Sequence, residues 1–76
     1  MEPRELEQQT ARRLRALHRE FEGRVEPEQI DLLGRHHYVR LTRNATVLDF
    51  IPLLVWRSTR DDIQRGAVSV GFHRAA

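Results

Sequence analysis

The four histidines are the residues of this chain best suited to bind a metal or to transfer a proton near neutral pH, and His36 and His37 are adjacent. Adjacent side chains on a helix point about 100° apart, whereas helical zinc sites place histidines four residues apart. The pair is therefore poorly placed to chelate one ion. Because His37 falls on a stripe of apolar positions, we expect its ring to pack in the core with a backbone partner.

Asp61 and Asp62 form the chain's adjacent pair of carboxylates, the residue type that acid–base catalysis uses. Arg57 and Arg65 lie four residues to either side of Asp61, at the spacing that places side chains on one helix face. This pattern favours a solvated face held by salt bridges over a catalytic couple.

Other catalytic arrangements are also missing from the sequence. Ser58 and Thr59 have no neighbouring histidine that could activate a hydroxyl. The glycines are too scattered for a phosphate-binding loop; they stand at positions 23, 34, 66 and 71. The sequence therefore predicts no catalytic residue, no metal ligand and no cofactor, and we expect a protein that is not an enzyme.

The size and composition of the chain favour association with another protein chain. A chain of 76 residues buries only about 60% of the surface that its unfolded form exposes, so small domains need disulfides, a metal or a partner for added stability. The chain has no cysteine, which excludes disulfides and thiolate metal sites. Its 13 basic residues, all arginine, are interspersed with 11 acidic residues, and the net charge is only +2. This mixture predicts a solvated surface rather than a nucleic-acid-binding tail.

The pattern of apolar residues and helix breakers predicts an all-α domain. Leu14, Leu17 and Phe21 recur at the spacing of one helical face, and Gly23 suits the left-handed residue that ends a helix. Pro3 and Pro27 suit first helical positions. The prediction is a three-helix bundle over residues 1–66, with helices at about 3–22, 27–43 and 46–65 and a flexible C-terminal tail at 67–76.

The start of the third predicted helix has two interpretations. If Thr46 is its N-cap, Pro52 stands at the sixth helical position, where a proline loses a backbone hydrogen bond and kinks the chain. If Asp49 is the N-cap, Pro52 stands in the first turn and no bond is lost. We expect one continuous segment with an irregular first turn.

The third predicted helix is apolar nearly all round, which is typical of a helix that is buried on all sides. One set of its residues forms the face expected to meet the core, namely Val47, Phe50, Ile51, Leu54 and Val55. A second set lies off that face, namely Leu48, Leu53 and Trp56. A helix in a three-helix bundle has two neighbours, so a second chain is the best explanation for the excess apolar surface.

We therefore predict a dimer interface that combines the second set with part of the first helix and a polar rim. Its residues are Leu6, Leu48, Leu53, Trp56, Arg57 and Arg60. Tryptophan and arginine are enriched among the residues that dominate binding energy at interfaces. The alternative is that Trp56 merely closes the end of the monomer core.

The sequence gives no sign of a membrane segment or an export signal. The N-terminal segment is polar and acidic, and the longest apolar run, from Phe50 to Trp56, is far shorter than the roughly 20 residues that span a bilayer. We expect a cytoplasmic protein that does not enter a membrane.

Several motifs together resemble a known module. They are the apolar helix ending in Phe21, the segment Val25-x-Pro27, the helix with Ile30 and Leu33, and Ala45-Thr46-Val47-x-Asp49-Phe50-Ile51-Pro52-Leu53-Leu54 followed by Arg57. From about Ala11 to Arg65 the chain resembles the actinobacterial three-helix-bundle dimerization domain, similar to the N-terminal domain of protein-tyrosine-phosphatase-like and arsenate-reductase-like proteins. The resemblance implies homodimerization. Fused relatives carry a catalytic domain with a nucleophilic cysteine, which this sequence lacks, so catalysis is not carried over.

Homodimerization is thus the expected function, with two alternatives. Arg35, Arg40 and Arg43 could contact phosphates, as in small helical domains that bind DNA or RNA. A nucleic acid is the less favoured partner, because a recognition helix needs a polar outer face and the third predicted helix is apolar. The domain could also be an adaptor for a separately encoded enzyme, using the same apolar surface.

Overall fold

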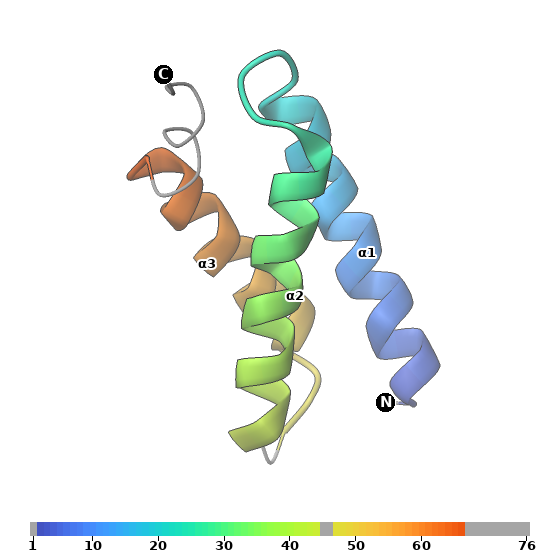
Figure 1. Ribbon diagram of the computed structural model, residues 1–76. Helices are drawn as coiled ribbons and strands as arrows, with labels where there is room; N and C mark the ends of the chain where they lie inside the picture. The colour runs from blue at the N-terminus through green and yellow to red at the C-terminus, as the bar shows by residue number, and fades with distance from the viewer. Residues whose placement is uncertain (1, 45–46, 67–76) are drawn as a thin grey trace.

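The computed structural model describes residues 2–44 and 47–66, and it confirms the predicted all-α three-helix bundle. The helices are α1 (Pro3–Glu20), α2 (Pro27–Asn44) and α3 (Ile51–Gln64), packed together in one bundle (Figure 1). The predicted tail at 67–76, and with it the division of the chain at residue 66, lies outside the described residues.

The first two helices follow their predicted bounds closely. Pro3 occupies the start of α1, where its missing N–H costs nothing, and the Glu2 carbonyl accepts the Leu6 N–H at 2.9 Å. Helix α1 ends at Glu20, two residues earlier than predicted. The turn that follows contains Gly23 at φ +83°, the left-handed conformation that glycine adopts without steric cost. Helix α2 begins at Pro27 as predicted.

Helix α3 corrects the prediction, because it begins at Ile51 rather than near residue 46. Asp49 and Phe50 form a turn, and the Leu48 carbonyl accepts the Ile51 N–H at 3.1 Å. The later start places Pro52 in the first turn, where an N–H has no helical partner in any case. A helix starting near residue 46 would instead have set the proline ring against the carbonyl of residue 48.

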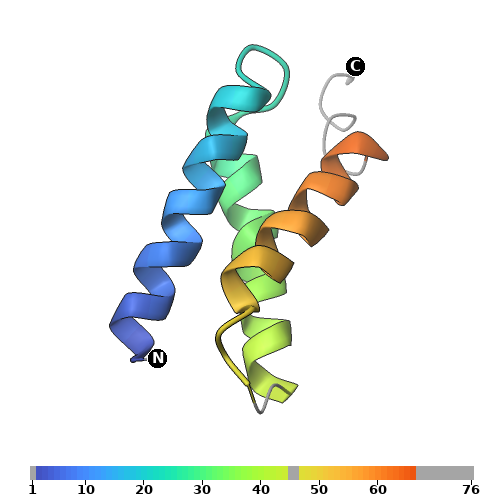
Figure 2. The same cartoon turned by 180° about the vertical axis from the view of Figure 1, so that it is seen from behind.

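The core is organised around one side of α3. This inner row recurs every four residues, and it comprises Ile51, Val55, Thr59 and Ile63. It faces the buried stripe of α1, formed by Leu6, Thr10, Leu14 and Leu17, and the buried positions of α2, Ile30, Gly34 and His37. Helices α1 and α2 each pack more extensively against α3 than against each other. Figure 2 shows the two diverging from the connecting turn toward the N-terminus of α1.

One buried hydroxyl group stands out in this core. Thr59 is fully buried, and its Oγ1 has no hydrogen-bond partner within the described residues. Thr10, also buried, donates its hydroxyl hydrogen to the Leu6 carbonyl at 2.8 Å. A buried polar atom without a partner costs free energy, whereas a paired one largely recovers the cost of losing water.

We therefore predict that Thr59→Val stabilises the domain by about 1 kcal/mol, because it removes an unpaired hydroxyl at little change in shape. Urea unfolding followed by circular dichroism measures the effect. Thr10→Val is the matched control, since it deletes a bonded hydroxyl and should give no gain. A Thr59→Val protein less stable than the wild type would show that the Thr59 hydroxyl is satisfied after all.

Candidate association surfaces

The outer side of α3 carries the largest group of exposed apolar side chains. Six large apolar residues are exposed in the described part of the chain, and four of them belong to the start of α3 and the segment before it. These four, called the α3 patch below, are Val47, Phe50, Leu53 and Leu54. Phe50 is 63% exposed and Leu53 is 40% exposed. The exposed Arg57 follows on the same side, one turn further along α3.

The boundary between the core and the outer side of α3 differs from the prediction. Ile51 and Val55 are buried as expected, but Val47, Phe50 and Leu54 are exposed rather than packed in the core. The reason is that the inner row continues through Thr59, a polar residue that the apolar pattern did not include. The core face is therefore rotated relative to the predicted one.

The residues predicted for the dimer interface differ in how exposed they are in the structure. Leu6 is 3% exposed, so its inclusion needs correction: it lies on the buried stripe of α1 and has almost no free surface. Leu48 and Trp56 are half-buried and pack against the core, as in the alternative interpretation of Trp56. Leu53 and Arg57 are exposed on the outer side of α3, where a second chain could reach them.

Arg60 holds α3 against α1 instead of forming a free rim. Its guanidinium group donates to both carboxylate oxygens of Glu20, with Nη2 to Oε2 at 2.7 Å and Nε to Oε1 at 3.1 Å. The same group lies 5.8 Å from the centre of the Trp56 ring. The hydrogen bond from Arg60 lowers the pKa of Glu20 below its usual value. Trp56 and Arg60 thus belong to the contact between α1 and α3.

A polar network joins α2 to α3. The His37 ring lies with Nε2 2.7 Å from Oδ2 of Asp62 and with Nδ1 2.9 Å from a guanidinium nitrogen of Arg40. Because the guanidinium can only donate, Nδ1 accepts and Nε2–H donates to the carboxylate. Arg65 donates to the other oxygen of Asp62 at 3.2 Å. The partner of His37 is therefore a side chain 25 residues away, and not the backbone group that we expected.

The same network corrects the predicted salt bridges of α3. Asp62, and not Asp61, pairs with Arg65, and within residues 2–44 and 47–66 neither Asp61 nor Arg57 takes part in an ion pair. Both ring nitrogens of His37 are occupied by protein groups. The arrangement holds two helices together and leaves neither nitrogen free to exchange a proton with a substrate.

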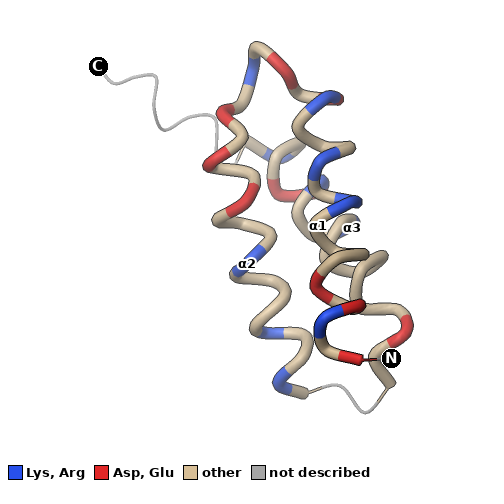
Figure 3. The backbone as a smooth tube through the Cα atoms, turned by 90° about the vertical axis from the view of Figure 1, so that its right-hand side faces the viewer, with Lys and Arg blue, Asp and Glu red and all other residues tan. Residues whose placement is uncertain are grey.

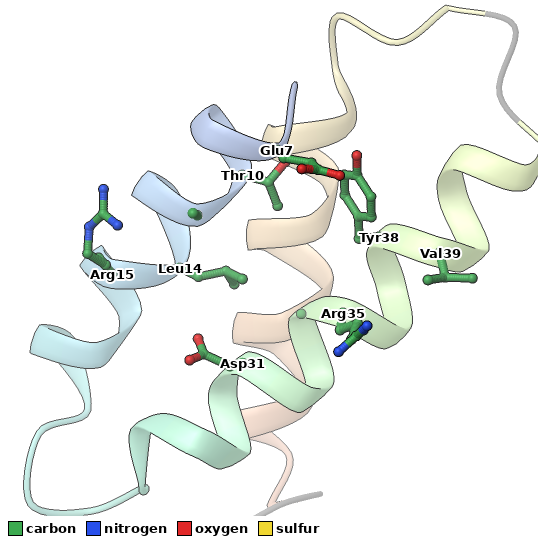
Figure 4. Close-up of a pocket in the computed structure, with 10 residues that line it drawn as sticks. Glu7, Thr10, Leu14, Arg15, Asp31, Arg35, Tyr38 and Val39 are labelled. Atoms are coloured by element: carbon green, nitrogen blue, oxygen red, sulfur yellow. The ribbon is translucent and has the colours of Figure 1, made fainter. Parts of the chain in front are cut away.

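A groove of about 510 Å³ opens between α1 and α2, on the side away from α3. Figure 4 shows Leu14 reaching toward α2 across its floor, with α3 passing behind. A Cβ atom built on Gly34 would lie 2.5 Å from Cδ1 of Leu14, so the absence of a side chain at Gly34 permits this close approach. Burial and the nearby Glu7 raise the pKa of the Tyr38 hydroxyl above its usual value. Acidic and basic side chains both line the groove, namely Glu7, Asp31, Arg15 and Arg35, so its charge does not favour the binding of an anion.

The exposed side of α2 is divided by charge. Figure 3 shows acidic residues along its first half and arginines along its second. The arginines Arg35 and Arg43 are exposed there, but Arg40 is bonded to His37, and the exposed Leu32 and Val39 interrupt the basic surface. This surface is smaller and less continuous than the basic footprint of a typical nucleic-acid-binding domain.

The described residues offer neither a metal site nor a membrane-spanning helix. They contain no group of three or more histidine and acidic side chains that could hold a metal ion. Among their helices, none has the length and apolar character needed to cross a membrane.

No family model matches the chain, and no curated protein or solved structure is significantly similar to it. The resemblance to a dimerization domain described above stays a prediction.

The contact between α2 and α3 can be tested by measuring stability against pH, because the pKa of Asp62 depends on that contact. Burial raises this pKa, but hydrogen bonds from His37 and Arg65 outweigh burial and lower it overall. A carboxylate whose pKa is lower in the folded state stabilises the fold above its unfolded pKa, which is about 3.9 for Asp. That contribution is lost as the pH falls through the folded pKa.

We predict that Asp62→Asn lowers the free energy of unfolding at pH 6 by about 1–2 kcal/mol, because charge-assisted hydrogen bonds are lost. It should also flatten the decline in stability that the wild type shows below about pH 4. Urea unfolding at pH 6 and pH 3 measures both. Asp61→Asn, a change at the adjacent exposed residue, is the control and should keep the wild-type pH dependence. Identical behaviour of the two variants would contradict the assigned network.

Proposed function

We propose that this domain is a non-catalytic association module that forms a homodimer through the α3 patch. The observation that carries the proposal is the concentration of exposed apolar surface on one side of one helix. Leu53 and Leu54 belong to the first turn of α3, and Phe50 and Val47 belong to the short segment before it, so four of the six exposed large apolar residues in the described part of the chain lie close together in the sequence. Contiguous apolar patches on small domains mark interaction sites.

The size of the domain supports a partner for this patch. A bundle of this length has a small core and no cysteine with which to reinforce it, so burial of the α3 patch would add stability that the monomer lacks. A second copy is always available at the concentration of the protein itself. A cytoplasmic location and the absence of enzymatic activity are parts of the same proposal, and they rest on the sequence.

Two other functions are alternatives to the homodimer. An adaptor for a separately encoded enzyme would present the α3 patch to a different protein. A DNA- or RNA-binding module would use the exposed arginines of α2, and its affinity would fall steeply with salt. The homodimer is favoured over nucleic-acid binding because four exposed apolar residues gather at α3, whereas Leu32 and Val39 interrupt the exposed arginines of α2.

We predict that Leu53→Asp converts the dimer into a folded monomer, because it places a charge at the centre of the α3 patch. The side chain is on the outer side of α3, and an acidic residue in the first turn of a helix is compatible with its dipole, so the fold should persist. Size exclusion with light scattering measures the mass, and circular dichroism checks the fold.

Leu32→Asp is the matched control, because Leu32 is equally apolar and 62% exposed but lies on α2. It should remain a dimer. A dimer that survives Leu53→Asp and is lost in Leu32→Asp would place the interface on α2 and reject the α3 patch.

A further inference from the structure

Three residues of the α3 patch and Arg57 are spaced symmetrically along α3, counting the N-cap residue Phe50 as its first position. Phe50 precedes Leu53 by three residues, and Arg57 follows Leu54 by three residues. At about 100° per residue, these four side chains lie within roughly 100° of arc on the outer side of α3. The midpoint of the set falls between Leu53 and Leu54, with Phe50 and Arg57 each about 5 Å from it along the helix axis.

Such a spacing is self-complementary when two copies of α3 pack antiparallel about a two-fold axis at that midpoint. A two-fold contact brings the same surface of both copies together, so residues beside the axis meet their own equivalents. Leu53 then contacts Leu53 of the second copy, and Leu54 contacts Leu54 of the second copy. Phe50 lies opposite Arg57 of the second copy, where a guanidinium group can cover an aromatic face.

The charges at the ends of the patch fit the same arrangement. Asp49, exposed directly before Phe50, would lie at the end of the contact that Arg57 of the second copy reaches. Within the described residues neither Asp49 nor Arg57 is engaged in an ion pair, so both are free for an intermolecular one. A parallel pair would instead place Arg57 against Arg57, and like charges in contact are unfavourable.

The groove between α1 and α2 is a poorer receptor for the patch. It lies on the side of the bundle away from α3, whereas the patch is on the outer side of α3 itself. Because the patch and the groove lie on opposite sides of the bundle, two copies cannot each place their patch in the other's groove within a single two-fold contact. Such a contact would add copies head to tail, as a ring or an open filament, rather than form a two-fold dimer.

We infer that the α3 patch binds the α3 patch of a second copy in an antiparallel, two-fold arrangement centred between Leu53 and Leu54, with Asp49–Arg57 pairs at both ends. This inference rests on the proposed homodimer and specifies its geometry. The parallel arrangement and the head-to-tail chain are the competing outcomes.

Charge reversal within one chain tests the arrangement. In an antiparallel dimer, Asp49→Arg and Arg57→Asp each replace two attractive pairs with two repulsive ones, so each should weaken the dimer about tenfold, about 1.4 kcal/mol. The double variant restores opposite charges at both ends and should return to within about threefold of the wild type. Sedimentation equilibrium on the full chain measures the dissociation constants. Arg12→Asp, an exposed change of equal charge on α1, controls for net charge.

Disulfide formation gives a second, independent measurement, since the chain has no cysteine of its own. Leu53→Cys should form a disulfide-linked dimer in a glutathione buffer, because cysteines bond when their Cα atoms are within about 7 Å. Phe50→Cys should not, because the two copies of residue 50 would be separated by about 10 Å along the axis.

The outcomes separate the geometry from the function. Rescue by the double charge variant, together with the disulfide at Leu53 alone, supports the antiparallel arrangement. A dimer in which the two reversals do not rescue each other, or in which Phe50→Cys forms the disulfide, overturns the arrangement and leaves the homodimer intact. Masses that grow beyond a dimer with concentration indicate the head-to-tail chain and also overturn it. A wild-type monomer at all concentrations rejects the proposed function itself.

Discussion

The packing of α3 against both of the other helices is the constraint on which the bundle depends. The inner row of α3 supplies buried side chains to both α1 and α2, which pack less extensively against each other and diverge away from their connecting turn. Two helices that separate in this way leave apolar stripes uncovered unless a third element fills the space. The row from Ile51 to Ile63 fills it, and substitutions there should unfold all three helices together rather than one.

Polar contacts then fix each pair of helices in register. Arg60 and Glu20 join α3 to α1, and His37 and Asp62 join α2 to α3. His18 lies 2.8 Å from Asp31 and joins α1 to α2 near the connecting turn. Apolar surfaces pack without strong directional preference, whereas hydrogen-bonded pairs accept few geometries, so these contacts select one arrangement of a small core. Because the inner side of α3 is fully used, its outer apolar residues are available for another chain.

The fold could be predicted from residues that act on their own stretch of backbone. The contacts of the candidate site could not, because they join residues that are far apart in the sequence. Pro27 and Gly23 act through their own backbone conformations, so the helix bounds near them could be predicted within two residues. The start of α3 was placed too early, because the choice between two caps depends on how the segment before Pro52 packs. The inner row of α3 was not predicted, because it contains the buried Thr59 and a pattern of apolar residues treats a threonine as a surface position. The partner of His37 is 25 residues distant and no spacing rule reveals it.

Self-association and stability are coupled in a homodimer of this domain, so one experiment addresses both. If two folded chains bury the α3 patch together, unfolding also requires dissociation, and the midpoint of thermal unfolding must depend on protein concentration. The measurement is the thermal midpoint of the wild-type chain by circular dichroism over about a hundredfold range of concentration. For a homodimer, the midpoint must rise steadily with concentration. A midpoint that stays constant over that range would show that the folded chain is a monomer, and it would contradict the proposed homodimer.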